Sequence, residues 1–303
     1  MNTNRIKELA NRYPILRAIL LPAILLRRPF VKMKVAWKTE VVNNFSELLV
    51  EDPVIRVDEF GGVFAIDSRS DLFARVVINK EYEPKFIKYC LKHIDPERDI
   101  IDVGANVGFY SVLFAKQLKT GRVVAVEPTQ NALKRLRRNI EMNGVTSRVD
   151  IFEGVVSDNI GQLEINTIAG KEEYSSIGVL QQSPVTGLKH VTEKVKSTTL
   201  DELVKSKSLN PAFIKIDVEG AENLVFKGAR NVLMEKRPII LSEISDTLLR
   251  ANGSSAEEVV KLLKECKYDV FDVGNPSGQV KVSRSEFEHI LCTPSELAIK
   301  FKA

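Results

Sequence analysis

Residues 102–108 read Asp-Val-Gly-Ala-Asn-Val-Gly, and they follow the apolar pair Ile100-Ile101. The apolar pair predicts a buried strand, and the two glycines predict a tight turn after it. The apolar segment 109–117 predicts the helix that the turn opens. A second apolar run, Val123-Val-Ala-Val126, ends in Glu127. This order of strand, glycine turn, helix, strand and acid is typical of one half of a nucleotide-binding α/β sheet.

The turn and the acid together predict a ligand that contains a ribose. Glycine lets a ligand approach the backbone closely, and the Glu127 carboxylate can accept hydrogen bonds from two adjacent ribose hydroxyls. A dinucleotide fingerprint needs glycine at its first, third and sixth positions, where this chain has Gly104, Asn106 and Phe109. The pattern therefore favours S-adenosylmethionine, whose amino-acid tail can lie along the turn while Asp102 meets its ammonium directly or through water. The alternative is a turn that the glycines shape for structural reasons alone.

The composition is that of an ordinary globular protein. Of 303 residues, 44% are hydrophobic and 28% are charged, and the net charge is +4. Such a near balance of charge does not require a nucleic-acid partner. The three cysteines lie far apart between apolar residues, which favours a reducing, cytoplasmic compartment and no metal cage: they are Cys90, Cys266 and Cys292.

The amino-terminal region is unusual. Residues 15–26 are almost wholly aliphatic, apart from Arg17 and Pro22, and the basic run Arg27-Arg28 follows them. The apolar run is too short for a membrane-spanning helix, and the basic run stands where a signal peptide would be cleaved. One hypothesis is that residues 12–34 contact the inner membrane surface peripherally. The other is a helix that packs on the protein itself or on a second subunit.

Alternating apolar segments predict a doubly wound α/β sheet over residues 98–303, after a hairpin and lead-in helix over 51–97 and a helical extension over 1–50. The expected strands are 54–57 and 63–67 in the hairpin, and 100–103, 123–127, 149–156, 213–218 and 239–244 in the sheet. We also expect a further short strand at 162–166 and a closing antiparallel pair at 268–273 and 289–293. The expected helices are 84–93, 109–117, 131–143, 200–206, 221–235 and 254–266. Residues 169–198 have no regular pattern, and we expect substrate loops there, beside the pocket.

Three acids stand at the carboxyl ends of expected strands, namely Asp102, Glu127 and Asp217, and ligands of such sheets lie beyond these ends. Glu219 follows Asp217 after one residue. Methyl transfer to a hydroxyl requires that donor and acceptor are aligned and that the acceptor loses its proton. Asp217 and Glu219 are therefore candidate catalytic residues, as base or as groups that orient the acceptor. The alternative is that Glu219 caps the next helix and Asp217 only binds the donor.

Two further assignments stay open. The chain has three histidines, His93, His190 and His289. We favour His190, in the irregular segment, as the alternative base. Asp217, Glu219 and Glu243 could hold a magnesium ion, which would make the reaction metal-assisted, although no His/Cys spacing indicates a structural metal site.

Several segments in the same order resemble the FkbM-type methyltransferases over about residues 80–295: Tyr82-Glu-Pro84, 102–111, Val124-Ala-Val-Glu-Pro128, Asn139-Ile-Glu-Met-Asn143, Thr198-Thr-Leu-Asp201, Ile214-Lys-Ile-Asp-Val-Glu-Gly-Ala-Glu222 and Arg237-Pro-Ile-Ile-Leu-Ser-Glu243. The resemblance implies a class I methyltransferase fold, S-adenosylmethionine as cofactor, and O-methylation of sugars or other small natural-product hydroxyls. Asp102, Gly104 and Glu127 match donor-binding positions of the family, and Asp217 and Glu219 match its signature segment.

We therefore expect the chain to methylate a small-molecule acceptor, a sugar, glycan or glycolipid hydroxyl. The expected donor-binding residues are Asp102, Gly104, Asn106, Gly108, Glu127 and Asp217. The first alternative is an RNA methyltransferase, but Asp217-Val-Glu-Gly220 lacks the proline and aromatic residues that hold a flipped base. The second is a non-enzymatic binding protein, which the presence of Glu127 and of the Asp217–Glu219 pair disfavours.

Overall fold

The computed structural model describes residues 52–79, 82–171, 174–177, 189–273, 275–279 and 287–298. The predicted amino-terminal extension, with its membrane contact over residues 12–34, lies outside these ranges. Within the described ranges, none of the helices combines the length and the apolar character that a membrane span requires.

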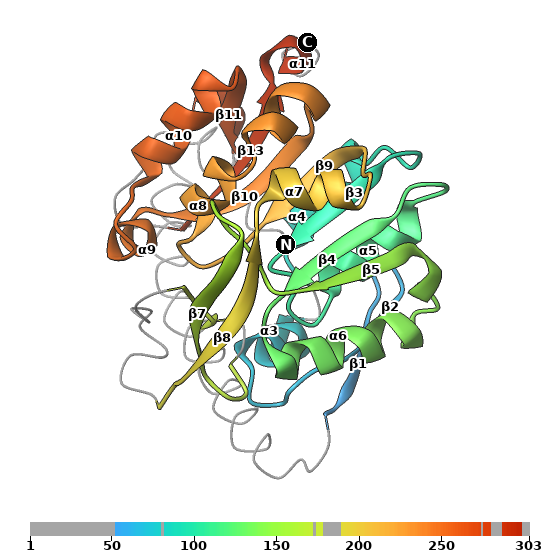
Figure 1. Cartoon of the computed structure of the whole chain (residues 1–303). Helices are drawn as coiled ribbons and strands as arrows, with labels where there is room; N and C mark the ends of the chain where they lie inside the picture. Colours follow the sequence, from blue (N-terminus) through green and yellow to red (C-terminus); the bar gives the residue numbers. More distant parts are fainter. Residues whose placement is uncertain are drawn as a thin grey trace, which may run out of the picture.

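An eight-stranded sheet forms the centre of the fold, in the order β12-β11-β13-β10-β9-β3-β4-β5 (Figure 1). Its strands are β3 (Asp99–Val103), β4 (Val123–Glu127), β5 (Val149–Glu153), β9 (Pro211–Ile216), β10 (Ile239–Ser245), β11 (Tyr268–Asp272), β12 (Asn275–Gln279) and β13 (Phe287–Pro294). Strands β5, β4, β3, β9 and β10 run parallel, and β13 lies antiparallel between β10 and β11. This arrangement confirms the doubly wound sheet and its closing antiparallel pair. The carboxyl ends of the parallel strands share one edge, where such sheets bind ligands.

Helices cover both faces of the sheet because successive strand side chains point to opposite faces. On one face, Ile100 and Phe213 pack with α4 (Pro84–His93), α5 (Phe109–Gln117) and α6 (Gln130–Met142). On the other face, Ile101 and Ile214 pack with α7 (Leu200–Ser206), α8 (Glu222–Lys227), α9 (Asp246–Ala251) and α10 (Ala256–Glu265). The short helix α11 (Ser295–Ala298) follows β13.

A second, three-stranded sheet corrects two predictions. It consists of β6 (Val155–Val156), β8 (Val191–Thr198) and β7 (Gly161–Thr167), in that order. The prediction of a single strand over 149–156 is wrong, because the chain leaves the main sheet at Gly154. The prediction that 169–198 is irregular is wrong for residues 191–198, which pair with β7 along its whole length.

Other elements also differ from the prediction. The single helix expected over 221–235 is divided into α8 and a π-helical turn at Val232–Lys236. Helix α3 (Asp71–Asn79), which follows the amino-terminal hairpin, was not expected, and neither were α9, α11 and strand β12.

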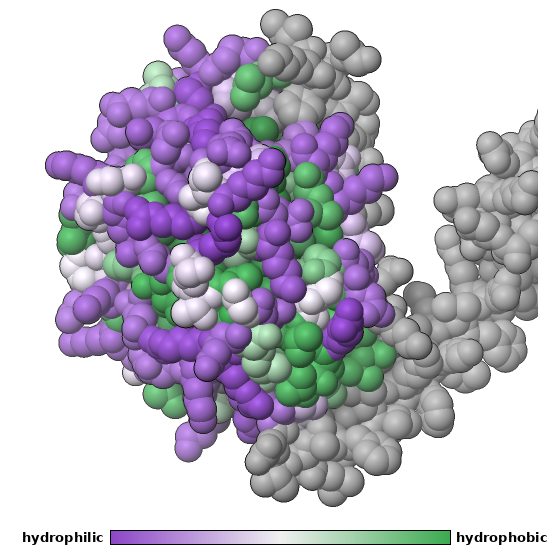
Figure 2. All heavy atoms as spheres, turned by 90° about the vertical axis from the view of Figure 1, so that its right-hand side faces the viewer, coloured by the Kyte–Doolittle hydropathy of each residue, from purple (hydrophilic) through white to green (hydrophobic). Residues whose placement is uncertain are grey.

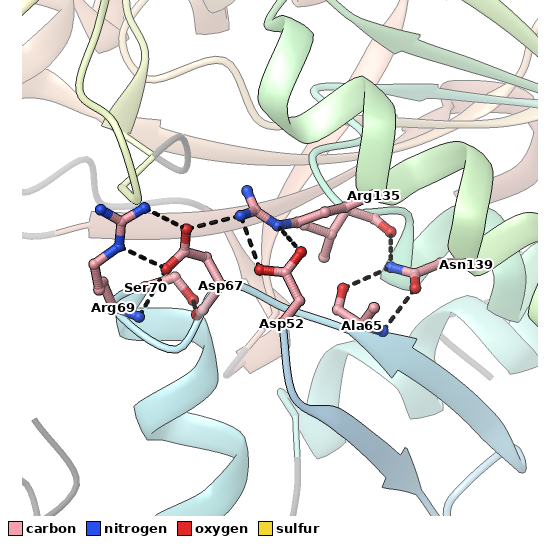
Figure 3. A network of polar contacts seen from close by, with 8 residues as sticks. Asp52, Ala65, Asp67, Arg69, Ser70, Arg135 and Asn139 are labelled. Carbon is pink, nitrogen blue, oxygen red and sulfur yellow. Dashed lines mark hydrogen bonds and ion pairs between the residues drawn. The ribbon is translucent and has the colours of Figure 1, made fainter. Parts of the chain in front are cut away.

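The hairpin of β1 (Val54–Val57) and β2 (Gly62–Ala65) is fixed to α6 by polar side chains (Figure 3). The amide of the fully buried Asn139 accepts from the Ala65 backbone N–H at 2.7 Å and donates to the carbonyls of Ala65 and Val107 at 3.1 and 2.8 Å. Arg135 forms ion pairs with Asp52 and Asp67 at 2.8 and 2.7 Å. The helix thus holds the hairpin against the glycine turn.

Among the described residues on the side drawn in Figure 2, hydrophilic side chains predominate, and hydrophobic ones show between them in patches. The large hydrophobic side chains that are exposed come from different parts of the chain: Val54, Val77, Leu91, Met142, Ile160, Val191 and Met234. Scattered exposed hydrophobic residues are ordinary on globular proteins, so they do not by themselves indicate a docking face.

We expect Asn139→Ala to lower the free energy of unfolding by about 3 kcal/mol, because three buried hydrogen bonds lose their partner. Urea denaturation would measure this change. Lys134→Ala, at an exposed position of the same helix, is the control and should cost less than about 0.5 kcal/mol. Equal effects of the two substitutions would contradict the anchoring role of Asn139.

Candidate active site

A cavity of about 390 Å³ opens at the carboxyl edge of the parallel strands. Its walls come from the ends of β3, β4 and β9, from the glycine turn, from α3 and from residues 174–177. This volume is within the range of small-molecule sites. Among the described residues that line the cavity, the cationic side chains of Arg75 and Lys215 are outnumbered by six carboxylates: Asp71, Glu83, Glu127, Asp217, Glu219 and Glu243. The cavity therefore attracts positive charge.

The glycine turn brings bare backbone to the cavity wall. The N–H groups of Gly104 and Ala105 both donate to the Val126 carbonyl, at 3.1 and 2.9 Å, which ties the turn to β4. Gly104 has a φ of +79°, and a Cβ added there would lie 1.9 Å from the Asp217 carbonyl oxygen. Only glycine fits this position, because the opposing atom belongs to the backbone. At Gly108, whose φ is +89°, an added Cβ would meet the end of the Leu136 side chain.

Glu127 closes β4 and organises the backbone around it. Its Oε2 accepts a hydrogen bond from the Asn106 N–H at 2.9 Å, and its Oε1 accepts from the N–H and hydroxyl of Thr129 at 2.9 and 2.7 Å. Asn106 has a φ of +49°, an uncommon conformation for a residue other than glycine. The carboxylate lines the cavity at the predicted position, while its contact with a ribose stays a prediction.

The structure places Asp102 beneath the cavity rather than in its wall. The side chain is fully buried, its Oδ2 accepts from the Ser111 hydroxyl at 2.6 Å, and its Oδ1 lies 3.8 Å from Lys215 Nζ. Burial raises the pKa of Asp102, and the charge of Lys215 opposes this effect. A direct contact of Asp102 with a ligand's ammonium therefore does not fit this arrangement. Its contacts support Ser111 and Lys215 instead.

Lys215 is a buried cation that sequence analysis missed. Its Nζ donates to the Gly104 carbonyl and to Asp217 Oδ2, each at 3.1 Å. Burial alone would lower the pKa of Lys215, but Asp217 and Asp102 hold it above its ordinary value. Period-two alternation along β9 could have revealed this residue, because it stands opposite Asp102 in the register of β3 and β9.

The loop after β9 brings the predicted catalytic pair into the cavity. Asp217 and Glu219 both line it, and the Asp217 side chain is 32% exposed. Glu219 has a φ of +53°, and its carbonyl accepts a hydrogen bond from the Ser176 hydroxyl at 3.2 Å. The buried carboxylate of Glu222 accepts from the N–H groups of Val218 and Gly220 at 3.3 and 3.2 Å, which fixes the loop.

A second group of polar side chains lines the cavity beyond Asp217. Glu243 on β10 and His289 on β13 lie 3.2 Å apart between Oε2 and Nε2. The Tyr110 hydroxyl donates to Glu83 Oε2 at 2.6 Å, and burial raises the pKa of Glu83. The structure thus places His289 at the cavity, whereas the favoured His190 is exposed beside β8 and does not line it. Sequence alone could not select His289, because its position depends on the pairing of β13 with β10.

Residues 174–177 form part of the cavity wall, which confirms the expected loop beside the pocket for this described part. They are joined to α3, because Asp71 accepts hydrogen bonds from the Tyr174 hydroxyl and from Lys171 Nζ. Asp71, Leu72 and Arg75 of α3 line the cavity as well. This side of the site was not predicted.

In the described part of the chain, no three His, Cys, Asp or Glu side chains are grouped so that they could hold a metal ion. Asp217, Glu219 and Glu243 share the cavity, but their placement gives the magnesium alternative no support.

Comparisons with known proteins match this site region. A family model described as the methyltransferase FkbM domain matches residues 102–270. Hexuronic acid methyltransferase AglP from Haloferax volcanii is 25% identical over 224 residues, which cover 72% of this chain and 82% of that protein. AMB antimetabolite synthetase AmbE from Pseudomonas aeruginosa is 23% identical over 210 residues, and the match covers 58% of this chain but spans only 10% of the synthetase. The crystal structure of methyltransferase FkbM from Methylobacillus flagellatus has a TM-score of 0.41 and 16% identity, covering 72% of this chain and 52% of that one.

We expect Gly104→Ala to destabilise the protein by about 2 kcal/mol more than Gly108→Ala, measured by urea denaturation. Both substitutions place a side chain at a positive φ, which costs about 1–2 kcal/mol. Gly104→Ala adds a collision with the Asp217 backbone, whereas the Leu136 side chain can move. Equal losses would show that the close approach at Gly104 is unimportant.

The pH dependence of stability tests the buried Glu222. Burial raises its pKa from 4.5 to about 7, so the folded state binds more protons than the unfolded state within this window. Stability is therefore lost as the pH rises from 4.5 to about 7. Glu222→Gln, which resembles the protonated acid, should remove up to about 3 kcal/mol of this loss, whereas the exposed Glu257→Gln should not. Parallel stability curves for wild type and Glu222→Gln would refute the interpretation.

Proposed function

This chain belongs to the FkbM methyltransferase family, and on this basis we propose that it transfers a methyl group from S-adenosylmethionine to a hydroxyl of a sugar, glycan or glycolipid. When bound, this cofactor supplies an electrophilic methyl group on a sulfonium. The observation that carries the proposal is that the glycine turn, Glu127 and the Asp217–Glu219 loop all line the same cavity.

The residues of the cavity fit this cofactor. Gly104 lets the backbone of Asp217 pack against the turn, and the turn itself lines the cavity, so a ligand can lie along its backbone. Glu127 stands at the end of the neighbouring strand, where a carboxylate can accept hydrogen bonds from ribose hydroxyls. Asp102 supports the site indirectly, through Ser111 and Lys215. We assign binding of the cofactor to Gly104, Asn106, Glu127 and Asp217, which line the cavity, and a supporting role to Asp102 and Gly108, which do not.

The loop after β9 suits the orientation of an acceptor. Lys215 Nζ holds the Asp217 carboxylate at 3.1 Å, while that side chain remains partly open to the cavity. A carboxylate fixed in this way can accept a hydrogen bond from a hydroxyl and so align its oxygen. We assign this role to Asp217 together with Glu219.

Two observations support a sugar rather than a nucleic acid as the acceptor. A relative that aligns over most of its own length is named a hexuronic acid methyltransferase. Carboxylates predominate among the charged side chains that line the cavity. They repel a phosphate backbone, whereas nucleic-acid sites are basic.

The acceptor class can be tested with S-adenosylmethionine that carries a labelled methyl group. The full chain would be incubated with methyl glucoside, methyl rhamnoside, glucuronic acid or total RNA. We expect alkali-stable label on a sugar, as an ether. We also expect Asp217→Asn and Glu219→Gln to lower turnover by about 100-fold and to lower the affinity for the donor by less. Label on RNA, or alkali-labile label that indicates a methyl ester, would contradict the hydroxyl acceptor.

We expect Glu127→Gln to weaken binding of S-adenosylhomocysteine by at least about 10-fold in calorimetry, equivalent to about 1.4 kcal/mol. The reason is that an amide has one acceptor oxygen where the carboxylate has two. Glu153→Gln is a matched control, because Glu153 stands opposite Glu127 in the register of β4 and β5 and does not line the cavity. Unchanged affinity in Glu127→Gln would show that the ribose is bound elsewhere.

A further inference from the structure

The cavity contains two titratable side chains, Glu243 and His289, that take no part in the proposed binding of the cofactor or in the orientation of the acceptor by Asp217. We propose that His289, held by Glu243, is the base that accepts the proton of the acceptor hydroxyl. This inference rests on the proposed function, because a hydroxyl acceptor has to lose a proton, whereas an ionised carboxylate does not.

The strand register places the two side chains together. Glu243 and His289 are direct partners in the antiparallel pairing of β10 and β13, and direct partners project from the same face of a sheet. Their side chains are 25% and 29% exposed and both line the cavity. A base has to be accessible to the ligand and has to be held in one position. The exposed part of each side chain gives the access, and the packing of the buried part restricts its movement.

The imidazole is fixed on two sides. Glu243 Oε2 lies 3.2 Å from Nε2, and the ring of Phe86 packs against the imidazole with a centroid distance of 3.9 Å and an interplanar angle of 69°. When Nε2 carries the proton and donates it to Glu243, Nδ1 is the nitrogen that can accept another proton. The carboxylate thus selects the tautomer, as in acid–histidine pairs that act as bases.

Carboxylates predominate among the charged groups around His289. A recess beside it is lined by Glu83, Tyr110, Lys215, Asp217 and Glu243. They come from the residue before α4, from α5, from β9 and the loop after it, and from β10. These side chains comprise three carboxylates, one ammonium and one phenol, so the positive charge that the ring gains during the reaction lies among mostly opposite charges.

The proton and electron balance of the step is simple. The hydroxyl proton passes to His289 Nδ1, and the oxygen forms a bond to the methyl carbon. The bond between that carbon and sulfur breaks, and its electron pair stays on sulfur as a neutral thioether. His289 later releases the proton to water, so no further reactant is needed.

This assignment separates the proton acceptor from the orienting carboxylate. Asp217 is held in an ion pair with Lys215, which suits a carboxylate that orients the acceptor. His289 contacts Glu243 through one ring nitrogen, and its other ring nitrogen can take the proton.

Kinetics of His289→Gln test the proposal. Glutamine retains a hydrogen-bonding group but cannot take the proton, so we expect kcat for the methylated sugar to fall about 100-fold with the affinity for S-adenosylhomocysteine unchanged. Wild-type activity should decline at acid pH, because a protonated imidazole cannot accept a proton, and this decline should be absent from the residual activity of His289→Gln. Imidazole added to the buffer should restore part of the activity of His289→Ala. His190→Gln, outside the cavity, is the matched control.

A spectroscopic measurement tests the pair without an acceptor. Nitrogen-15 NMR of the full chain with S-adenosylhomocysteine should show neutral His289 with its proton on Nε2, and Glu243→Gln should reduce that preference. The same tautomer in both proteins would overturn the role of Glu243. If the wild type methylates a sugar and His289→Gln keeps its kcat and its pH profile, the base assignment is overturned and the proposed function stands. If the wild type methylates RNA or forms an ester, the proposed function fails, and the base assignment fails with it.

Discussion

One buried ammonium group connects the parts of the site that have to stay in register. Lys215 Nζ bonds the carbonyl of Gly104 in the turn after β3 and the carboxylate of Asp217 in the loop after β9, and it lies 3.8 Å from Asp102 Oδ1. Without this cation, the buried carboxylate of Asp102 and the partly exposed carboxylate of Asp217 would lie close together with no positive charge between them. Leaving one member of a buried ion pair uncompensated typically costs about 3–5 kcal/mol. The close approach of the turn to the loop thus depends on charge as much as on the absence of a side chain at Gly104.

Sheet geometry explains why the chemistry gathers on one side. Alternate residues of each strand project to the face of the sheet that α4 and α5 cover. On this face, the positions near the carboxyl edge are polar. Asp102 and Lys215 are register partners, and so are Glu243 and His289. The opposite face keeps apolar side chains such as Val103 and Ile216 at the same level. These register partners on β3, β9, β10 and β13 therefore form one row of polar side chains, which extends from the cofactor side of the cavity to the proposed acceptor side.

Local patterns in the sequence were sufficient for α4, α5 and α7 and for β3 and β4, whose boundaries agree with the predicted ones to within a residue. Apolar segments bounded by turn residues, which are local in the sequence, mark these elements. Features that depend on distant partners could not be predicted in this way. Arg135 of α6, for example, binds Asp52 and Asp67, which are 83 and 68 residues away in the chain. Strand β8 and the position of His289 likewise depend on pairing between segments that are far apart in the chain.

The predominance of carboxylates in the cavity has a consequence for turnover. Six acidic side chains against two basic ones attract a ligand that bears an extra positive charge more strongly than a neutral ligand of the same shape. Transfer of the methyl group removes the sulfonium charge and so weakens this attraction. The demethylated nucleoside therefore dissociates more readily than the methylated one, without any movement of the sheet. Dissolved ions screen such attraction. The difference in affinity between the methylated and the demethylated nucleoside therefore becomes smaller as ionic strength rises.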